Sequence, residues 1–132
     1  VRLVDDYGDP VSIKDRPSIN ITAQELAIGD RIKVLGFPGM GGIKITITPG
    51  EQAGWWTGGG NGWEGDFYKT SAKMGPGISG GAAFTELGGD FVGIPTGGSS
   101  KEDSEGGDTL GLIRPSHYAV PLIEKAATFS DR

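Results

Sequence analysis

The chain has 132 residues, of which 25 are glycine and none is cysteine, and its formal net charge is −5. This length allows one domain with a modest core, and the lack of cysteine excludes disulfides and any zinc or thiol site built on cysteine. The acidic balance and the scattered Lys and Arg argue against nucleic acid as a partner, and the short apolar runs exclude a membrane-spanning helix. The single histidine, His117, excludes a multi-histidine metal site, so we expect neither a metal nor a cofactor.

Short strands separated by glycine and proline turns are predicted along most of the chain. The two strongest signals are residues 31–37 and 42–48, which alternate apolar and polar side chains with a period of two. In the second of these the apolar face should be buried and the polar face exposed. Residues 38–42 between them predict a hairpin-like connection. Weaker strands are predicted at residues 1–4, 19–22, 67–70, 82–85, 91–96 and 110–114, with a turn at 87–90.

Two segments are predicted to be loops and one to be a helix. Residues 54–65 hold all three tryptophans among glycines. These aromatics could stack on a sugar, clamp a peptide, or pack in the core or an interface, and we favour packing. Residues 99–108 are acidic, but their spacing does not fit a calcium loop. Pro121 suits the first position of a helix to about residue 129, with Leu122, Ile123 and Ala126 packed inward.

The segment that carries chemistry is residues 69–84, which read KTSAKMGPGISGGAAF. Gly77, Gly80 and Gly81 leave the backbone bare around the hydroxyl of Ser79. Such a turn can direct the backbone N–H groups of Gly77 and Ser79 at one point, and two converging donors form an oxyanion hole. A serine hydroxyl beside such a hole is the arrangement that acyl transfer requires of its nucleophile.

This segment resembles the nucleophile loop of the trypsin-like serine peptidases in their bacterial HtrA/Deg form. That form reads TDAxIxPGNSGGPL where this chain has TSAKMGPGISGGAA. Residues 28–39, 88–96 and 118–121 also resemble family segments in the same order, the last being the strand that enters the C-terminal helix. The resemblance covers residues 19–127. It implies an all-β fold: a six-stranded antiparallel Greek-key barrel of trypsin-like type with a short C-terminal helix.

The resemblance also implies roles for individual residues. Ser79 would be the nucleophile, and the amides of Gly77 and Ser79 would form the oxyanion hole. An extended substrate would pair with the backbone near Thr96 and Gly97. Lys73 would lie near the base of the first specificity pocket, where it either favours an acidic substrate side chain or points to solvent.

The chain departs from the family pattern at positions that bear on catalytic activity. Ile78 stands where an Asp or Asn usually precedes the serine, and Ala82 replaces the usual Pro. The family's catalytic His and Asp belong to its N-terminal barrel, whereas residues 1–132 correspond to the C-terminal barrel as a single domain. We therefore expect the N-terminal barrel, the base and its Asp to be absent, and this chain alone to be inactive. His117 is interpreted as a structural histidine.

Asp5 and Asp6 are interpreted as surface charges. The sequence is consistent with two functions. The first is the nucleophile-bearing barrel of a trypsin-like serine endopeptidase. The alternative is a non-catalytic half-barrel that binds extended peptides or assembles as a stand-alone barrel. The partners expected are a peptide or protein substrate, together with either the missing N-terminal barrel or a second copy on the exposed barrel face. The resemblance alone suggests a periplasmic or secreted location.

Overall fold

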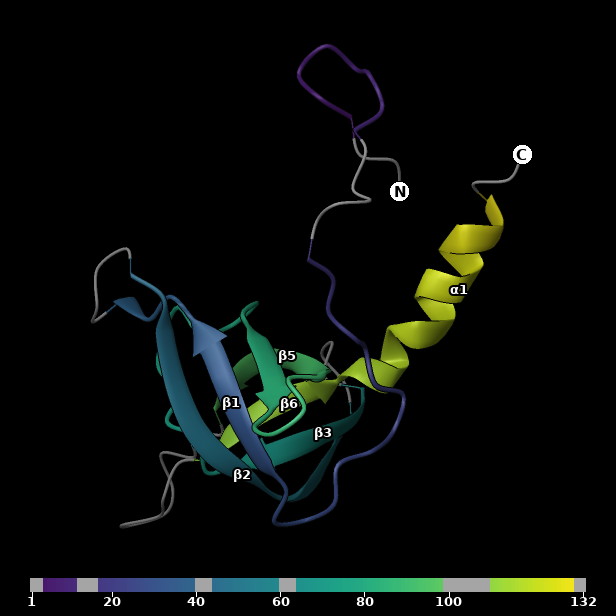
Figure 1. Ribbon diagram of the computed structural model, residues 1–132. Coiled ribbons are helices and arrows are strands. Elements are labelled where there is room, and N and C mark those ends of the chain that lie inside the picture. Colours follow the sequence, from purple (N-terminus) through teal and green to yellow (C-terminus); the bar gives the residue numbers. More distant parts are fainter. Residues whose placement is uncertain (1–3, 12–16, 40–43, 60–63, 99–109, 130–132) are drawn as a thin grey trace.

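The computed structural model describes residues 4–11, 17–39, 44–59, 64–98 and 110–129. Its elements are β1 (Arg31–Gly36), β2 (Thr46–Gly58), β3 (Gly65–Thr70), β4 (Ala82–Thr85), β5 (Phe91–Gly98), β6 (Gly111–Pro115), the short 3₁₀ helix η2 (Ser116–Tyr118) and α1 (Val120–Phe129). The strands close into a barrel in the order β1-β2-β3-β6-β5-β4, and every pair is antiparallel (Figure 1). Strand β4 pairs with β1, and β1, β2 and β3 follow one another around the barrel. This spatial order is that of a Greek key. The predicted six-stranded barrel with a C-terminal helix is confirmed.

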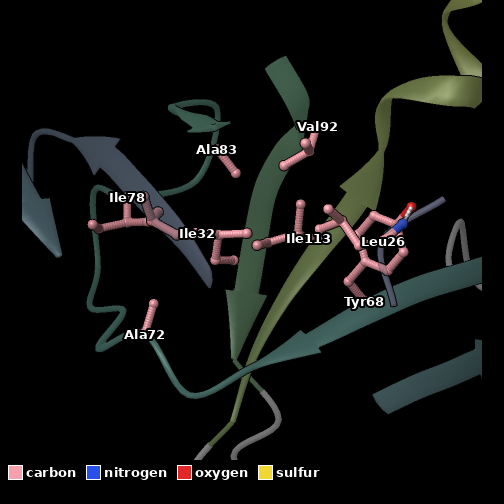
Figure 2. Packing of buried hydrophobic residues seen from close by; sticks show 9 residues of the cluster. Leu26, Ile32, Tyr68, Ala72, Ile78, Ala83, Val92 and Ile113 are labelled. Atoms are coloured by element: carbon pink, nitrogen blue, oxygen red, sulfur yellow. Dashed lines mark hydrogen bonds between the residues drawn. The ribbon is translucent and has the colours of Figure 1, made fainter. Parts of the chain in front are cut away.

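The core fills the inside of the barrel. Its nine buried residues are Leu26, Ile32, Val34, Tyr68, Ala72, Ile78, Ala83, Val92 and Ile113 (Figure 2). Most come from alternate positions of the strands, as a period of two requires. Ala72 and Ile78 are different, because they lie between β3 and β4 in the segment that leads to Ser79. The core therefore anchors the candidate nucleophile segment at two points.

Tyr68 makes the stability of the barrel sensitive to alkaline pH. Burial raises the pKa of Tyr68 above 10.0; the hydrogen bond from the Leu26 amide, at 3.1 Å, opposes this rise, and the charge of Glu25 adds to it. Because the unfolded chain ionises first, this contribution to stability is complete below about pH 10 and is lost as the pH rises toward the folded-state pKa. We expect the urea midpoint to fall more steeply above about pH 10 in the native protein than in Tyr68→Phe. Equal slopes would show that another group titrates.

The inward face of β2 is the opposite of the one predicted. Thr48 lies directly across from Val34 in the register, and Val34 points into the core. Directly opposed residues share a face of the sheet, so Thr48 also points inward. Ile45 and Ile47 are each 55% exposed. The predicted period of two is therefore right, but the predicted inward face is wrong. The strand also begins at Thr46, and residues 42–43 lie outside the described residues.

The tryptophan-rich segment is largely strand, because β2 runs through its first part and β3 begins at its end. The prediction of a loop is therefore wrong for residues 54–58 and for Gly65, whereas Gly59 and Glu64 lie between the strands and residues 60–63 lie outside the described residues. Trp55 packs on Tyr68 with ring centroids 4.6 Å apart, and Trp56 packs on Phe67 at 5.3 Å. These two tryptophans thus pack on the barrel, as the favoured interpretation held.

The C-terminal helix does not pack as predicted. α1 extends away from the barrel (Figure 1), and Leu122 and Ile123 are 68% and 48% exposed. The last strand is also not residues 118–121: β6 ends at Pro115, and Tyr118 lies in η2. The weaker signal at 110–114 provides the sixth strand, so the chain has already left the barrel when it reaches Tyr118.

The segments before β1 form single bridges where strands were predicted. Val4 pairs with Pro10, and Ile21 pairs with Phe91 at the start of β5. Residues 1–3 lie outside the described part of the chain, as does the acidic segment 99–108. The strands predicted at 82–85 and 91–96 are present as β4 and β5, and that predicted at 67–70 as β3.

Candidate active site

Ser79 lies on an exposed turn that leads from the core into β4. Ile78 before it is only 1% exposed, whereas Ser79 itself is open to solvent. Gly77 and Gly80 on either side have φ angles of +94° and +81°, which side-chain-bearing residues rarely adopt. The buried isoleucine and the two left-handed glycines together hold the serine at the surface.

Backbone hydrogen bonds hold this turn in place. The amide of Ile78 donates to the carbonyl of Gly75 at 3.1 Å, and the amide of Gly81 donates to the carbonyl of Ile78 at 2.9 Å. The amide of Gly80 donates to the carbonyl of Pro95 at 2.9 Å. The last bond joins the turn to β5, so the serine and the end of β5 are neighbours.

Two amides of the turn have no acceptor among the described residues. Among the described residues, the N–H groups of Gly77 and Ser79 donate no hydrogen bond. The amide of Ile78 lies between them in sequence and is bonded, because it donates to the carbonyl of Gly75. Exposed, unpaired amides beside a serine hydroxyl are the groups that could bind a developing oxyanion.

The turn packs so closely on the end of β1 that glycine is required. A Cβ on Gly77 would lie 2.3 Å from the carbonyl oxygen of Phe37, and one on Gly81 would lie 2.0 Å from that of Leu35. Both obstacles are backbone atoms, so neither can rotate away. The sequence pattern indicated these glycines, but their packing partners, Leu35 in β1 and Phe37 just after it, could be found only in the structure.

The end of β5 has an open backbone edge beside the turn. β4 pairs with β5 only as far as Gly93, and the Gly80 amide bonds the carbonyl of Pro95, so among the described strands no neighbour pairs with that side of residues 96–98. On the other side a bulge between Pro95 and Gly97 shifts the pairing with β6. Thr96 lies within this bulge, and Gly97 has a φ of +149°. An open edge of this kind can pair with an extended peptide.

The other candidate residues are not gathered at Ser79. Lys73 is exposed and takes part in neither ion pair found in the described part of the structure. His117 stacks on Tyr118 with ring centroids 4.5 Å apart, and its Nδ1 is buried without a hydrogen-bond partner among the described residues. Asp5 accepts the amides of Tyr7 and Asp9, each at 2.9 Å, within its own turn.

In the described part of the chain, no cluster of three or more His, Asp or Glu side chains is arranged to hold a metal ion. None of the helices formed by the described residues has the length and apolar character needed to cross a membrane.

Comparison with known proteins identifies the family. Residues 8–94 match the trypsin-like peptidase domain. The chain belongs to the trypsin-like peptidase family. The resemblance drawn from the nucleophile segment is thereby confirmed, and the match begins upstream of the first segment that resembled the family in sequence.

Solved structures of HtrA-type proteases share the trypsin-like fold of this chain. The protease AlgW with a tripeptide is 26% identical with a TM-score of 0.66, over 87% of this chain. AlgW with a decapeptide is also 26% identical with a TM-score of 0.66, over 91% of this chain. In both cases the chain spans only 37% of the length of the matched chain. No curated protein matches the sequence.

Proposed function

We propose that this trypsin-like domain is the nucleophile-bearing barrel of a serine endopeptidase, equivalent to the C-terminal barrel of the family. The observation that carries the proposal is that the amides of Gly77 and Ser79 donate to no acceptor among the described residues and lie in the same exposed turn as the serine hydroxyl. These two donors are therefore available to the carbonyl oxygen of a substrate.

In the proposed reaction, the hydroxyl oxygen of Ser79 attacks the carbonyl carbon of a peptide bond. The hydroxyl proton passes to a base, and the carbonyl oxygen becomes an oxyanion held by the amides of Gly77 and Ser79. Collapse of this intermediate breaks the C–N bond, and the amine leaves with the proton from the base. Water then hydrolyses the acyl-serine ester by the same steps, releasing the acid and restoring Ser79.

The base must come from outside these 132 residues. The sequence holds one histidine, and its ring stacks on Tyr118 with Nδ1 buried, so it does not serve Ser79. Without a base a serine hydroxyl is a weak nucleophile, because general-base catalysis contributes about 10²–10⁴-fold. This chain alone is therefore inactive in the proposal.

The base-bearing partner, in this proposal, docks on the groove beside β5. This groove has a volume of about 440 Å³ and includes Ile94, Tyr118 and Leu122, all of which are partly exposed apolar side chains. Ile94 is adjacent to Pro95, to which the nucleophile turn is bonded, so a domain seated here would lie next to Ser79. A second copy of the chain on the same groove is the alternative, which sedimentation velocity of the isolated chain would detect.

The substrate in this proposal is an extended peptide paired with the open edge of β5 near Thr96 and Gly97. The structures of AlgW with a tripeptide and with a decapeptide support peptide binding by this fold. One competing function uses the same edge: a barrel that binds peptides without cleaving them.

Peptide titration followed by amide NMR tests the substrate site. We expect shifts concentrated at residues 96–98 and in the turn around Ser79, with equal affinity in Ser79→Ala, because pairing uses the backbone. Shifts elsewhere, or none, would contradict the proposed edge. Adding a base-bearing N-terminal barrel separates the two functions: hydrolysis that Ser79→Ala abolishes identifies a peptidase, and binding without hydrolysis identifies the binding module.

A further inference from the structure

Arg114 leaves β6 on the side opposite to the core residue Ile113, and its guanidinium lies against two aromatic rings. Its Cζ atom is 3.9 Å from the centroid of the Phe67 ring and 5.1 Å from that of the Tyr118 ring. Phe67 is only 1% exposed, and the Tyr118 hydroxyl accepts the amide of Asp66 at 3.1 Å, so both rings are held in position. These contacts use the flat face of the guanidinium and leave its N–H edge to other partners.

The N–H edge of this half-buried guanidinium has no acceptor among the described residues. Both ion pairs found in that part of the chain belong to Glu86. The carboxylate of Asp66 accepts the Thr57 hydroxyl at 2.7 Å, and Glu64 is exposed and forms no ion pair with Arg114. A cation that is partly withdrawn from water is stabilised by an anionic partner, and here that partner has to come from outside the described residues.

Arg114 lines the groove of about 440 Å³ beside β5, together with apolar side chains. Ile94 is directly opposite Arg114 in the pairing of β5 with β6, and Leu122 reaches the groove from α1. Gly65 keeps space beside the cation, because a Cβ there would lie 2.9 Å from Nη1 of Arg114. Sites for small ligands have volumes of about 300–1,000 Å³ and are mostly apolar, with a few polar groups that fix the orientation of the ligand.

We propose that this groove binds an apolar carboxylate. The two carboxylate oxygens accept from the N–H edge of Arg114, whose planar fork matches a carboxylate in a bidentate way. The hydrocarbon part of the ligand contacts Ile94 and Leu122. The hydroxyl of Ser116 in the same lining already donates to the carbonyl of Thr22 at 2.6 Å, so the ligand needs no further polar group to satisfy it.

Two sources supply this chemistry: a free organic acid, and the C-terminal residue of a peptide, which carries a carboxylate next to its own side chain. The inference does not rest on the role of Ser79, because the groove needs no catalysis to bind an acid. The base-bearing partner proposed above docks on the same groove, so a bound carboxylate would compete with it.

Heteronuclear NMR of the 132-residue chain tests this inference, read at the side-chain Nε–Hε group of Arg114 and at the backbone amides. The probes are 4-phenylbutyrate and 4-phenylbutyramide, which share a carbon skeleton and differ in charge. We expect the acid to bind at least about tenfold more tightly than the amide, with shifts at Arg114, in η2 and in the first turn of α1. Arg114→Gln should remove this preference. Arg114→Lys should keep only part of it, because an ammonium group does not form the fork.

Arg31→Gln is the matched control, because Arg31 carries the same charge but pairs with Glu86 at 3.6 Å. It should leave the ratio of the two affinities within about twofold of the native ratio. Leu122→Ser changes the apolar wall and leaves the cation in place. It should weaken the binding of both probes by about threefold or more and keep their ratio, since the lost contact is apolar.

Acetyl-Gly-Gly-Phe and its C-terminal amide distinguish the two sources. Tighter binding of this peptide acid than of 4-phenylbutyrate supports a peptide C-terminus as the ligand, and the reverse order supports a free acid. Equal affinity of the native protein for each acid and its amide would overturn the inference. No shift at Arg114 with any acid, or an unchanged preference in folded Arg114→Gln, would overturn it as well. None of these readouts involves Ser79, so the proposed peptidase function is tested separately.

Discussion

The 132-residue chain is expected to hydrolyse an activated peptidyl ester no faster than its Ser79→Ala variant. The physical reason is that the serine acts through a base, and the only histidine in the sequence has its Nδ1 buried and its ring against Tyr118. Members of a catalytic triad are strongly non-additive, so removing the serine costs little once the base is missing. The measurement is the steady release of a chromogenic alcohol at about pH 8, with both proteins at equal concentration.

His117→Ala is the control for this result. It should hydrolyse the ester at the same rate as the native chain, because His117 contacts Tyr118 and not the nucleophile turn. Turnover by the native chain that both Ser79→Ala and His117→Ala abolish would contradict the account, since it would place the base within this chain. Turnover lost in Ser79→Ala alone would point to a different internal base.

The second large effect is expected from Gly77→Ala. The new Cβ would meet the carbonyl oxygen of Phe37 at 2.3 Å, and the residue has a φ of +94°. Left-handed backbone costs a side-chain-bearing residue about 1–2 kcal/mol, and relief of the clash requires the turn to move. Movement withdraws one of the two free amides, and loss of one oxyanion donor typically costs about 10²–10³-fold. The measurement is the labelling rate of Ser79 by a fluorophosphonate, with imidazole supplied as the base.

Gly75→Ala is the matched control for Gly77→Ala. Gly75 lies in the same turn, but a Cβ there would have no heavy atom within 4 Å. It should label at the native rate, and circular dichroism should show that both variants are folded. Native labelling in Gly77→Ala would contradict the assignment of its amide to the oxyanion hole.

The conformation of the turn around Ser79 could be predicted because its requirements are local, whereas the chemical role of Ser79 stays a prediction. A serine flanked by Gly77, Gly80 and Gly81 needs left-handed backbone and close approach, and two of these glycines have a positive φ. The strands at β4 and β5 were predicted for similar reasons, since turns bound them on both sides. Each of these patterns lies within a few consecutive residues, so it can be recognised without knowledge of the rest of the fold.

The predictions that failed depend on contacts distant in sequence. The alternation in residues 45–48 fixes a period but not a phase, and the pairing of Thr48 with Val34 determines which face is inward. The helix was predicted from its composition, but inward packing of Leu122 needs a surface that the described residues do not provide.

The measurement that tests the central claim most directly is the site of fluorophosphonate attachment when imidazole supplies the missing base. The probe is incubated with the native chain and with Ser79→Ala, and the adduct is located by mass spectrometry of peptides. The account predicts one adduct, on Ser79, formed faster as imidazole is raised and absent from Ser79→Ala. An adduct on another residue, or no adduct at any imidazole concentration, would contradict the claim that this turn is the nucleophile site of a peptidase.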